Sequence, residues 1–454
     1  MVHRASRELR TLVPTGMLGF GFPDDSFEMN LALNPHVIGI DAGSTDSGPH
    51  NLGGGIVEAT RSTTTDDLRR ILTASRSRRI PVVIGSAGTS GSDFGIEWML
   101  DIAHEIARER GWSLRIATVR SELHKDYIKR KLRAGKIRSL GPEEQLSVQT
   151  IEETTHIVGL MGVEQIVEAL DLEPDLVIAG RSCDAAIFAS LAIREGYPKG
   201  LAWHMGQILE CGAMCSEADH GAAESMTGII REDHFTVGSP KHSIVCSPSS
   251  VAAQSFYEES DPARLNLPGG HVWMGNSKFE QAQDGWVNIS GSEWRESDRY
   301  EVLIEGATQR GYRSITIAGA RDPYFISNID LILDAVHETT AQRFSDDFDL
   351  DFVVYGRDGV MGHLEPTPIP AHELGLLIRV VAESQTLADT IVAFVRSSID
   401  HFKYPGIKAT AANLAYPLAP GTLSCGPVYE FSVHHLMTLD SPDECFEVDV
   451  GSYS

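Results

Sequence analysis

The sequence predicts an α/β protein: an N-terminal domain with a parallel sheet, and a second α/β or α+β domain. Three observations support this fold class. Short apolar runs alternate with amphipathic segments in the first half of the chain, which is typical of a parallel sheet with right-handed crossovers. Glycine-rich polar loops follow several of these runs. The chain has 454 residues, and chains beyond about 250–300 residues usually divide into domains.

The first half of the chain supplies the alternation. Each expected strand is a short apolar run, and each expected helix carries apolar residues at helical spacing on one face. Thr65 is the expected N-cap of the first of these helices. The expected strands are 37–40, 80–84, 114–119 and 176–179, and the expected helices are 65–77, 94–110, 163–170 and 185–192.

The second half differs, because residues 228–300 carry short alternating segments and many turn residues. We place a domain boundary near residue 235. Residues 1–235 then form the α/β domain with the glycine-rich loops, and residues 236–454 form a second domain that closes over the site. The acidic C-terminal segment is expected to be a solvated tail or an edge. Further expected strands are 314–318, 352–355 and 374–383, and further expected helices are 326–336 and 387–399.

Composition narrows the range of partners. The chain has 38 Lys and Arg against 63 Asp and Glu, and it lacks the sustained basic face that nucleic acids or anionic membranes require. No apolar run reaches the ~18 residues of a membrane-spanning helix, and no signal peptide is recognisable at the start. Six cysteines are too few for a disulfide scaffold. We expect a cytoplasmic protein whose partners are a small anionic molecule and either further copies of itself or a small partner subunit.

The most informative segment is the loop after the expected strand 37–40. It carries Asp41, Ser44, Thr45 and Asp46 among several glycines. Polar, glycine-rich loops at the carboxyl ends of parallel strands are where α/β proteins bind ligands, since glycine lets a ligand approach the backbone closely. The alternative is a tight strand-to-helix turn that binds nothing.

Two more strand-end loops have the same design. The second carries Ser86, Thr89 and Ser90 directly before a helix, where amides and hydroxyls suit a phosphate or carboxylate. The third, 180–184, adds Arg181, whose fixed charge suits a carboxylate or phosphate. Because carboxyl ends of parallel strands gather at one edge, we expect the three loops to form one composite anion site.

Other candidates stand on single residues. Cys183 beside Arg181 is either a nucleophile with a lowered pKa or a small buried residue at a helix start. His271 and Arg321 lie in expected loops. His271 could donate a proton and Arg321 could bind an anion, or each could simply stabilise a turn. Cys211 and Cys215 are four residues apart, but no second matched pair accompanies them, so no metal site is expected.

The segment 38–45 also resembles the first phosphate loop of the actin/sugar-kinase ATPase superfamily. In that fold the motif opens a β-hairpin, whereas Asp-Ser-Gly-Pro follows here. The second phosphate motif and the adenosine motif are not convincingly present, and the chain has no GxGxxG, Walker lysine or HExxH motif. The ATPase stays as an alternative.

Several longer motifs resemble the acyclic terpene utilisation AtuA-like family. They are Ile-Asp-Ala-Gly-Ser-Thr-Asp-Ser-Gly-Pro at 40–49, Asp-Leu-Val-Ile-Ala-Gly-Arg-Ser-Cys-Asp-Ala-Ala at 175–186, His-Met-Gly-Gln-Ile-Leu-Glu-Cys-Gly-Ala at 204–213, and the segments 246–254 and 267–270. The likeness covers nearly the whole chain. It implies catabolism of acyclic terpenes or related branched acids, whose intermediates are CoA thioesters, and it identifies no reaction.

The leading hypothesis is an enzyme that acts on a small carboxylate or an acyl-CoA thioester as a lyase, hydratase or isomerase. Such chemistry needs an acid/base pair, an anion clamp and an oxyanion stabiliser, and CoA enters only as part of the substrate. Asp46 and Asp184 are the expected acid/base pair, Arg181 the clamp, and the amides of residues 85–90 the oxyanion stabiliser. A non-catalytic ligand-binding partner subunit is the alternative from another class. The expected catalytic residues are Asp46, Asp184, Cys183 and His271, and the expected substrate-binding residues are Asp41, Ser44, Thr45, Ser86, Thr89, Ser90, Arg181, Ser182 and Arg321.

Overall fold

The computed structural model describes residues 7–141, 145–217, 223–257, 260–283, 285–344, 347–367, 369, 371–409 and 413–453. The chain divides into two compact units. Unit 1 comprises Met1–Thr308 and Phe431–Ser454, and unit 2 comprises Gln309–Glu430. This division differs from the sequence-based boundary near residue 235. That boundary falls inside strand β9 (His234–Gly238), which pairs with β8 and β13 in the main sheet of unit 1, so the short strands after residue 235 extend the first domain.

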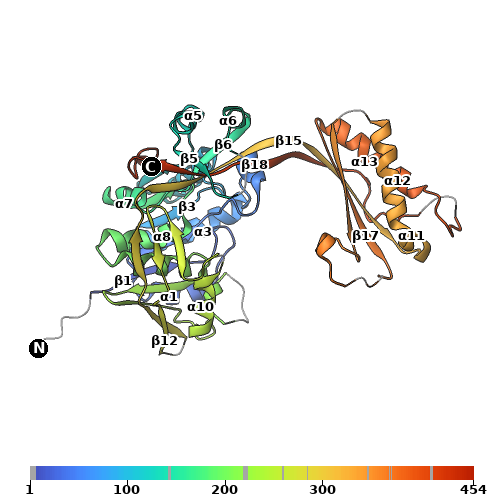
Figure 1. Cartoon of the computed structure of the whole chain (residues 1–454). Helices are drawn as coiled ribbons and strands as arrows, with labels where there is room; N and C mark the ends of the chain where they lie inside the picture. Colours follow the sequence, from blue (N-terminus) through green and yellow to red (C-terminus); the bar gives the residue numbers. More distant parts are fainter. Residues whose placement is uncertain are drawn as a thin grey trace, which may run out of the picture. The chain divides into compact units, whose positions relative to one another are not determined.

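A ten-stranded sheet forms the centre of unit 1 within the described residues. Its strand order is β12-β13-β9-β8-β1-β2-β3-β7-β4-β19 (Figure 1). The five central strands, β1-β2-β3-β7-β4, pair in parallel. The strands on either side of them pair antiparallel. The strands are β1 (Leu9–Val13), β2 (Val37–Asp41), β3 (Val82–Gly85), β4 (Leu114–Arg120), β7 (Leu176–Ala179), β8 (Met226–Ile230), β12 (Lys278–Gln283), β13 (Trp286–Ser290) and β19 (Glu447–Tyr453).

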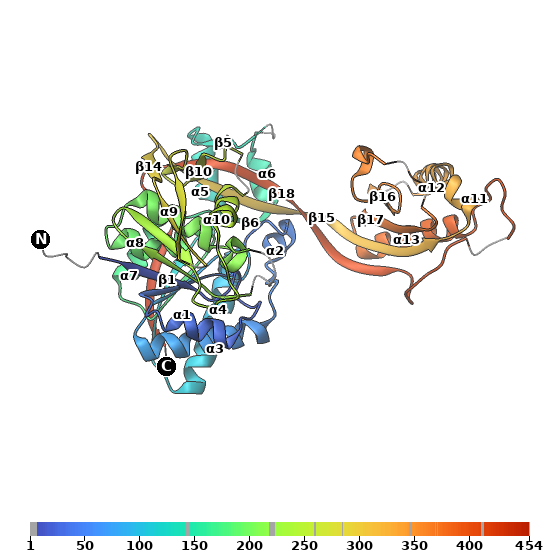
Figure 2. The ribbon, with the colours of Figure 1, turned by 90° about the horizontal axis from the view of Figure 1, so that it is seen from below.

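The parallel strands are buried on both faces, which explains their nearly continuous apolar sequences. Ile38 and Ile40 pack into one apolar cluster with α3 and α4, whereas Val37 and Val83 pack into another with α8 and α9. Figure 2 shows α1 and α3 on one side of β1 and α8 and α9 on the other. The helices of unit 1 are α1 (Asp24–Leu31), α2 (Pro49–Gly54), α3 (Arg61–Arg78), α4 (Asp93–Arg110), α5 (Lys125–Arg133), α6 (Val148–Glu153), α7 (Glu164–Asp171), α8 (Asp184–Arg194), α9 (Lys199–Leu209), η1 (Gly212–Cys215) and α10 (Pro248–Phe256).

Smaller pairings complete unit 1. A three-stranded sheet has the order β10-β11-β14, β5 pairs with β18, and β6 pairs with β15. Two long strands, β15 and β18, continue from unit 1 into unit 2. The bounds are β5 (Ile137–Ser139), β6 (Thr154–Gly159), β10 (Arg264–Leu267), β11 (Gly270–Trp273), β14 (Glu293–Glu296), β15 (Tyr300–Ala320) and β18 (Leu423–Leu439).

Two local details differ from the sequence-based expectation. The N-cap of α3 is Thr60, whose side chain accepts a hydrogen bond from the Thr63 amide, while the Thr65 hydroxyl donates to the Arg61 carbonyl inside the helix. The acidic C-terminal segment includes β19, which pairs antiparallel along the whole of β4. Of the two expected alternatives, a solvated tail or an edge, this segment therefore forms an edge of the sheet.

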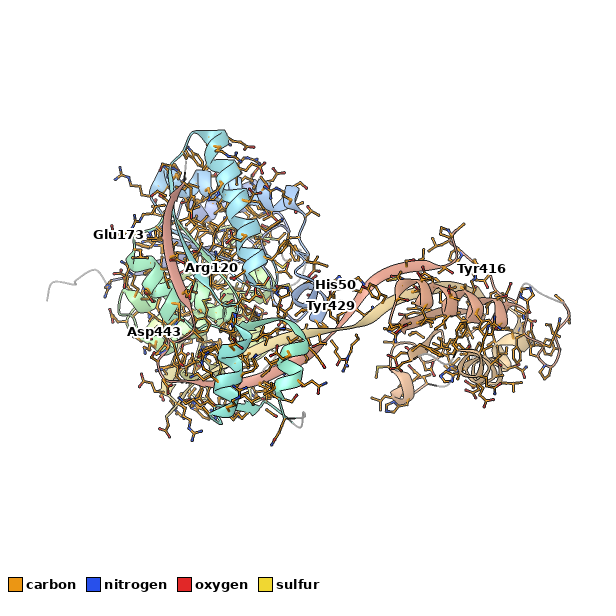
Figure 3. All side chains as sticks on the ribbon, turned by 90° about the horizontal axis from the view of Figure 1, so that it is seen from above. His50, Arg120, Glu173, Tyr416, Tyr429 and Asp443 are labelled. Carbon is orange, nitrogen blue, oxygen red and sulfur yellow. The ribbon has the colours of Figure 1, made fainter. Side chains whose placement is uncertain are left out.

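Unit 2 has the β-α-β-β-α-β order of a split βαβ fold. Its sheet runs β16-β17-β15-β18, and α12 and α13 share an apolar cluster with residues of β15, β16 and β17. The unit contains a cavity of about 730 Å³ that Tyr416 lines (Figure 3). The α/β fold class is confirmed. The elements of unit 2 are α11 (Pro323–Ser327), α12 (Ile329–Arg343), β16 (Phe348–Tyr355), η2 (Gly362–Leu364), β17 (Leu374–Ala382) and α13 (Gln385–Asp400).

Candidate active site

The three predicted loops meet at the carboxyl edge of the parallel strands. β2, β3 and β7 are neighbours in the sheet, and backbone hydrogen bonds join the loops that follow them. The Ser86 amide donates to the Gly180 carbonyl at 3.0 Å, the Thr89 amide to the Ala42 carbonyl at 3.1 Å, and the Arg181 amide to the Gly91 carbonyl at 3.2 Å. The sequence-based expectation that these loops converge is therefore correct.

The glycines of these loops allow close packing of one backbone against another. A Cβ atom on Gly43 would lie 2.4 Å from the Cα of Thr89, and one on Gly91 would lie 2.0 Å from the backbone nitrogen of Arg181. The amides of Ser86, Ala87, Thr89, Ser90 and Gly91 all donate to backbone carbonyls. The expected oxyanion role for the amides of residues 85–90 is thus wrong at these positions, because the donors are already used within the fold.

Replacing Gly91 with Ala should separate backbone strain from steric clash. Gly91 (φ +66°) and Gly111 (φ +65°) share a left-handed conformation, but no atom lies within 4 Å of a Cβ built on Gly111. We expect Gly111→Ala to cost roughly 1–2 kcal/mol of stability and Gly91→Ala to cost roughly 1–3 kcal/mol more. Thermal unfolding of the two variants measures the difference, and equal losses would contradict the packing role.

Arg181 lies at the centre of the converging loops, and only 6% of it is exposed. Its Nε donates to Oε2 of Glu305 at 2.9 Å, and the Thr45 hydroxyl donates to Oε1 of the same carboxylate at 2.5 Å. Contacts from the other end of the guanidinium are longer, with Nη1 3.5 Å from Asp184 and 3.4 Å from the Ser86 hydroxyl. The charge of Arg181 is therefore neutralised inside the fold, and its main contact is with Glu305 rather than with open space.

Carboxyl groups outnumber cations in this cluster. Burial raises the pKa of Asp41 well above its usual range, the charge of Asp184 raises it further, and Arg181 and two backbone amides oppose this only in part. Glu305 is 4% exposed. Burial raises the pKa of its carboxyl group, but the charge of Arg181 lowers it, and the net pKa lies below the usual value. The charge of Asp46 also reaches Arg181. The charge of His434 also lowers the pKa of Glu305, but the acids named here outnumber the cations, which does not fit the anion site expected from the sequence.

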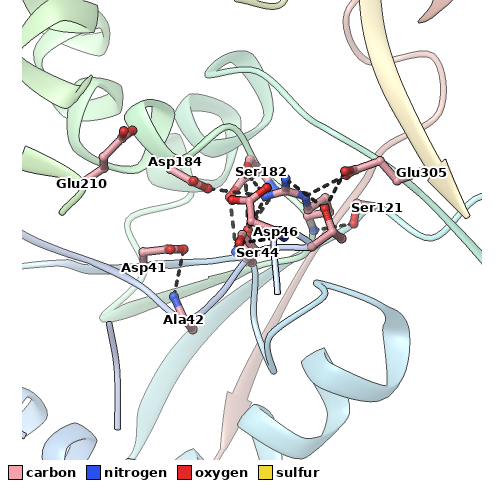
Figure 4. Close-up of polar contacts among 12 residues, drawn as sticks. Asp41, Ala42, Ser44, Asp46, Ser121, Ser182, Asp184, Glu210 and Glu305 are labelled. Atoms are coloured by element: carbon pink, nitrogen blue, oxygen red, sulfur yellow. Dashed lines mark hydrogen bonds and ion pairs between the residues drawn. The ribbon is translucent and has the colours of Figure 1, made fainter. Parts of the chain in front are cut away.

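Figure 4 shows how the carboxyl groups are arranged. Asp41, Asp184 and Glu210 come from one side of the cluster, and Glu305 comes from the opposite side. Asp41 ends β2 and Asp184 begins α8, so both are held at the edge of the sheet by regular structure. The charge of Asp184 acts on Asp41, whereas the side chain expected to pair with Asp184, Asp46, is exposed.

The expected hydroxyl ligands mostly contact the protein itself. The Ser182 hydroxyl accepts from the Ser86 amide at 3.3 Å, the Thr89 hydroxyl accepts from the Glu58 amide at 2.9 Å, and the Ser90 hydroxyl donates to Ser92 at 3.3 Å. Ser44 is the partly exposed member of the set, and its hydroxyl accepts from the Asp46 amide at 3.1 Å. These side chains hold the loops in position, and Ser44 remains open to a ligand.

Ser86 and Thr89 have φ angles of 45° and 75°. Residues other than glycine rarely adopt this left-handed region, and the cost is usually about 1–3 kcal/mol when the surrounding structure imposes it. Strained residues of this kind concentrate at binding and catalytic sites. Their position at the end of β3 therefore supports a functional role for this edge of the sheet.

The remaining candidates have other surroundings. Burial raises the pKa of the Cys183 thiol, and the charge of Asp184 adds to this. Arg181 lowers that pKa as expected, but by less, so the net lowering expected for a nucleophile is wrong. His271 lies in β11, where its neighbours across the sheet are Asn266 and Arg295. Burial lowers the pKa of His271.

Arg321 belongs to unit 2, where its Nη1 donates to the His372 carbonyl at 2.7 Å. It lines the cavity of that unit together with Asp322 and Lys408. His204, in the motif at 204–213, is fully buried. Burial lowers its pKa to about 3, and its Nδ1 lies 2.6 Å from the Ser292 hydroxyl, so it acts as a neutral core residue.

Two residues at the centre of the cluster were missed by sequence reasoning. Glu305 lies in β15, more than a hundred residues from the third loop, and its only local signal is an acid between Ile304 and Gly306 in an apolar run. Ser121 follows β4, and its hydroxyl accepts from the Arg181 amide at 2.6 Å and donates to the Gly91 carbonyl at 3.0 Å. A fourth strand end therefore joins the three that were predicted.

Comparison with known families decides the family. The model described as "Acyclic terpene utilisation family protein AtuA" matches residues 59–416. The chain belongs to the AtuA family. The match includes Arg181, Asp184 and Glu305, and it begins after Asp41 and Asp46. No curated protein and no solved structure matches the chain.

Two further findings concern the described part of this AtuA-family chain. No group of three or more His, Cys, Asp or Glu side chains in it has an arrangement suited to a metal ion. No helix in it is long and apolar enough to cross a membrane.

Proposed function

We propose that this AtuA-family protein is a catabolic enzyme that performs acid/base chemistry on the acyl group of a branched CoA thioester, as a hydratase, lyase or isomerase. The observation that carries the proposal is the placement of two carboxyl groups at the edge of the sheet, Asp41 at the end of β2 and Asp184 at the start of α8, where burial and the charge of Asp184 raise the pKa of Asp41. A carboxyl group held protonated near neutral pH can donate to a carbonyl oxygen as negative charge develops on it. This revises the pair expected from the sequence, with Asp41 in place of Asp46.

The charge of the cluster favours a thioester over a free carboxylate as the reacting group. A carboxylate placed beside Asp184, Glu305 and Asp46 would meet like charges, and Arg181 is already paired. A thioester carbonyl is neutral and can accept a hydrogen bond from a protonated Asp41. The phosphates of CoA would then lie outside the cluster, and the enzyme would work in the cytoplasm, where CoA thioesters are made and used.

Roles for the remaining groups follow from their contacts. Arg181 and Glu305 hold each other, and the long contact from Nη1 keeps Asp184 near the pair. The hydrogen bond from the Thr45 hydroxyl to Glu305 ties the loop after β2 to β15. Ser44 and Asp46 lie at the rim, where a substrate would meet them first. Substitution of Asp184 with Asn should remove turnover. It should not leave Arg181 buried without a counter-charge, because the ion pair between Arg181 and Glu305 remains.

A ligand screen by thermal shift tests the proposal. We expect isovaleryl-CoA to raise Tm, with about 2.7 kcal/mol of stabilisation at one hundred times its Kd, and isovalerate alone to have no effect. Stabilisation without turnover of any acyl-CoA would favour a non-catalytic binding subunit. Stabilisation by Mg-ATP but not by any CoA thioester would favour the ATPase alternative. The occupied amides of the second loop argue against that outcome, because phosphate loops need free amides.

A further inference from the structure

The cavity of unit 2 is lined wholly by residues of that unit. Its volume, about 730 Å³, lies within the range of roughly 300–1,000 Å³ that is typical of small-molecule sites. The end of β15, the start of β17, Tyr404 and Tyr416 (Figure 3) form parts of its wall. A single inorganic ion would fill little of this volume, so the cavity suits an organic molecule.

Two glycines lie side by side where the sheet lines this cavity. Gly319 of β15 is directly opposite Gly375 of β17, and both line the cavity. Directly opposed residues share a face of the sheet, so the pair leaves bare backbone on that face. Tyr355 of β16 is opposite Gly375 on its other side. Its Cβ lies 3.5 Å from a Cβ built on Gly375, but no atom of its ring comes within 4 Å. The Tyr355 ring therefore does not pack on the glycines.

The fold itself does not require glycine at these two positions. Neither Gly319 nor Gly375 has a φ in the left-handed region. A Cβ built on Gly319 would meet only two carbonyl oxygens, at 3.8 and 4.0 Å, which is ordinary contact. Gly311 on the same strand is the opposite case, because a Cβ there would lie 2.5 Å from the Ala382 carbonyl oxygen. Glycine weakens a strand and often marks the close approach of a ligand. Room for a ligand is therefore the reason that remains for the pair.

Two cations also line the cavity, Arg321 and Lys408. Nη1 of Arg321 donates to the His372 carbonyl at 2.7 Å, which leaves further N–H donors of the guanidinium unused. The Lys408 ammonium lies 5.8 Å from the centroid of the Tyr324 ring. In the part of the chain that the structure describes, neither cation has a carboxylate partner.

The two acids of the cavity wall do have partners within unit 2. Asp322 accepts hydrogen bonds from the Tyr324 amide and the Tyr404 hydroxyl, each at 2.8 Å. Glu373 lies 3.9 Å from Nε2 of His372. The unused donors of the cavity are thus on its cations, and charged donors of this kind bind carboxylates and phosphates.

We propose that unit 2 binds a flat anion of the nucleotide type, with its ring against Gly319 and Gly375 and its phosphate held by Arg321 and Lys408. A planar ring can lie against bare backbone, and a phosphate carries enough negative charge for two cations. This site is separate from the acid cluster of unit 1 and does not depend on the proposed function. Two sources share the chemistry: the adenosine 3′,5′-bisphosphate end of a CoA thioester, and a free mononucleotide.

Calorimetry with adenosine 3′,5′-bisphosphate and the full-length protein tests the proposal. We expect saturable binding, and binding weaker by at least about tenfold for adenosine or inorganic phosphate, since each uses only part of the site. Lys408→Gln should weaken binding of the bisphosphate roughly tenfold, the usual effect of losing a hydrogen bond from a charged group. Lys403→Gln is the matched control, because Lys403 is an exposed lysine of the same unit outside the cavity wall. It should bind like the wild type.

Gly319→Val separates a ligand site from a structural glycine. Valine should weaken binding by at least about tenfold by filling the space of the ring. It should not lower Tm, because strands favour valine over glycine. A structural glycine would give the reverse, a lower Tm with unchanged binding. Gly319→Ala adds only the atom whose contacts are 3.8 and 4.0 Å, so it should fold like the wild type and bind with intermediate affinity.

Competition identifies the source of the ligand. If isovaleryl-CoA displaces the bisphosphate and Gly319→Val weakens both, the ligand is the nucleotide end of a CoA thioester. If AMP binds and isovaleryl-CoA does not displace it, the ligand is a free nucleotide. The inference is overturned if the wild type binds neither the bisphosphate nor AMP, or if Gly319→Val and Lys408→Gln bind them as the wild type does. Loss of turnover in Asp184→Asn would still support the proposed function, so the two can fail separately.

Discussion

Substitution of Glu305 with Gln should destabilise unit 1 by about 3–5 kcal/mol, because it leaves the guanidinium of Arg181 buried without its counter-charge. The ion pair is 2.9 Å long, and both side chains are less than a tenth exposed. The same change weakens the acceptor for the Thr45 hydroxyl. Thermal unfolding followed by circular dichroism measures the loss of stability of this variant relative to the wild type at one scan rate.

Glu301→Gln is the matched control for this prediction. Glu301 lies on the same strand, β15, and pairs with Arg138 at 2.8 Å, but the two side chains are 23% and 57% exposed. Exposed pairs contribute about 0–1 kcal/mol, so this variant should unfold close to the wild type. If the two substitutions cost the same, then Glu305 is not the structural partner of a buried charge.

Substitution of Asp41 with Asn should remove activity while raising the stability of the fold at neutral pH. The pKa of Asp41 is raised in the folded protein, so the folded state retains a proton that the unfolded chain releases. Stability therefore falls as pH rises from about 3.8, the value of the unfolded group, through the higher folded value. Asn has no proton to lose, and its Oδ1 can still accept the Ala42 amide that bonds to Asp41 at 2.9 Å.

The gain in Tm should be largest at pH values above the folded pKa of Asp41 and should vanish below the unfolded one. Deuterium exchange into isovaleryl-CoA should fall by about 10²–10⁴-fold, the usual contribution of a general acid or base. Asp46→Asn is the control, because that side chain is exposed, and its Tm should not change. Opposite effects on stability and activity are expected where a fold carries a strained functional group. A lower Tm for Asp41→Asn would contradict the account.

Much of the fold follows from local sequence signals. The strand 176–179 was predicted with the bounds that the structure has for β7, and α4 was predicted within one residue. Both succeed because a buried parallel strand and an amphipathic helix depend on the residues within them. Convergence of the loops after β2, β3 and β7 also followed from the rule that parallel strands end at one edge.

The missed features depend on contacts between distant segments. Glu305 and Arg181 are 124 residues apart, and the pairing of β6 with β15 helps to place Glu305 beside the third loop. The glycines were taken as room for a ligand, whereas Gly43 and Gly91 make room for other loops. Sequence alone also suggested Asp46 as the partner of Asp184, because the burial that raises the pKa of Asp41 cannot be seen before the fold is known.

The most direct test of the central claim is the protonation state of Asp41. A protonated carboxyl group has a C=O stretch in the infrared that is separate from the carboxylate bands, and the difference spectrum of wild type minus Asp41→Asn isolates it. We expect that band at neutral pH, and we expect isovaleryl-CoA to shift it as the carboxyl donates to the thioester carbonyl. Absence of the band at neutral pH would show that Asp41 is ionised, and would contradict the proposed acid/base site.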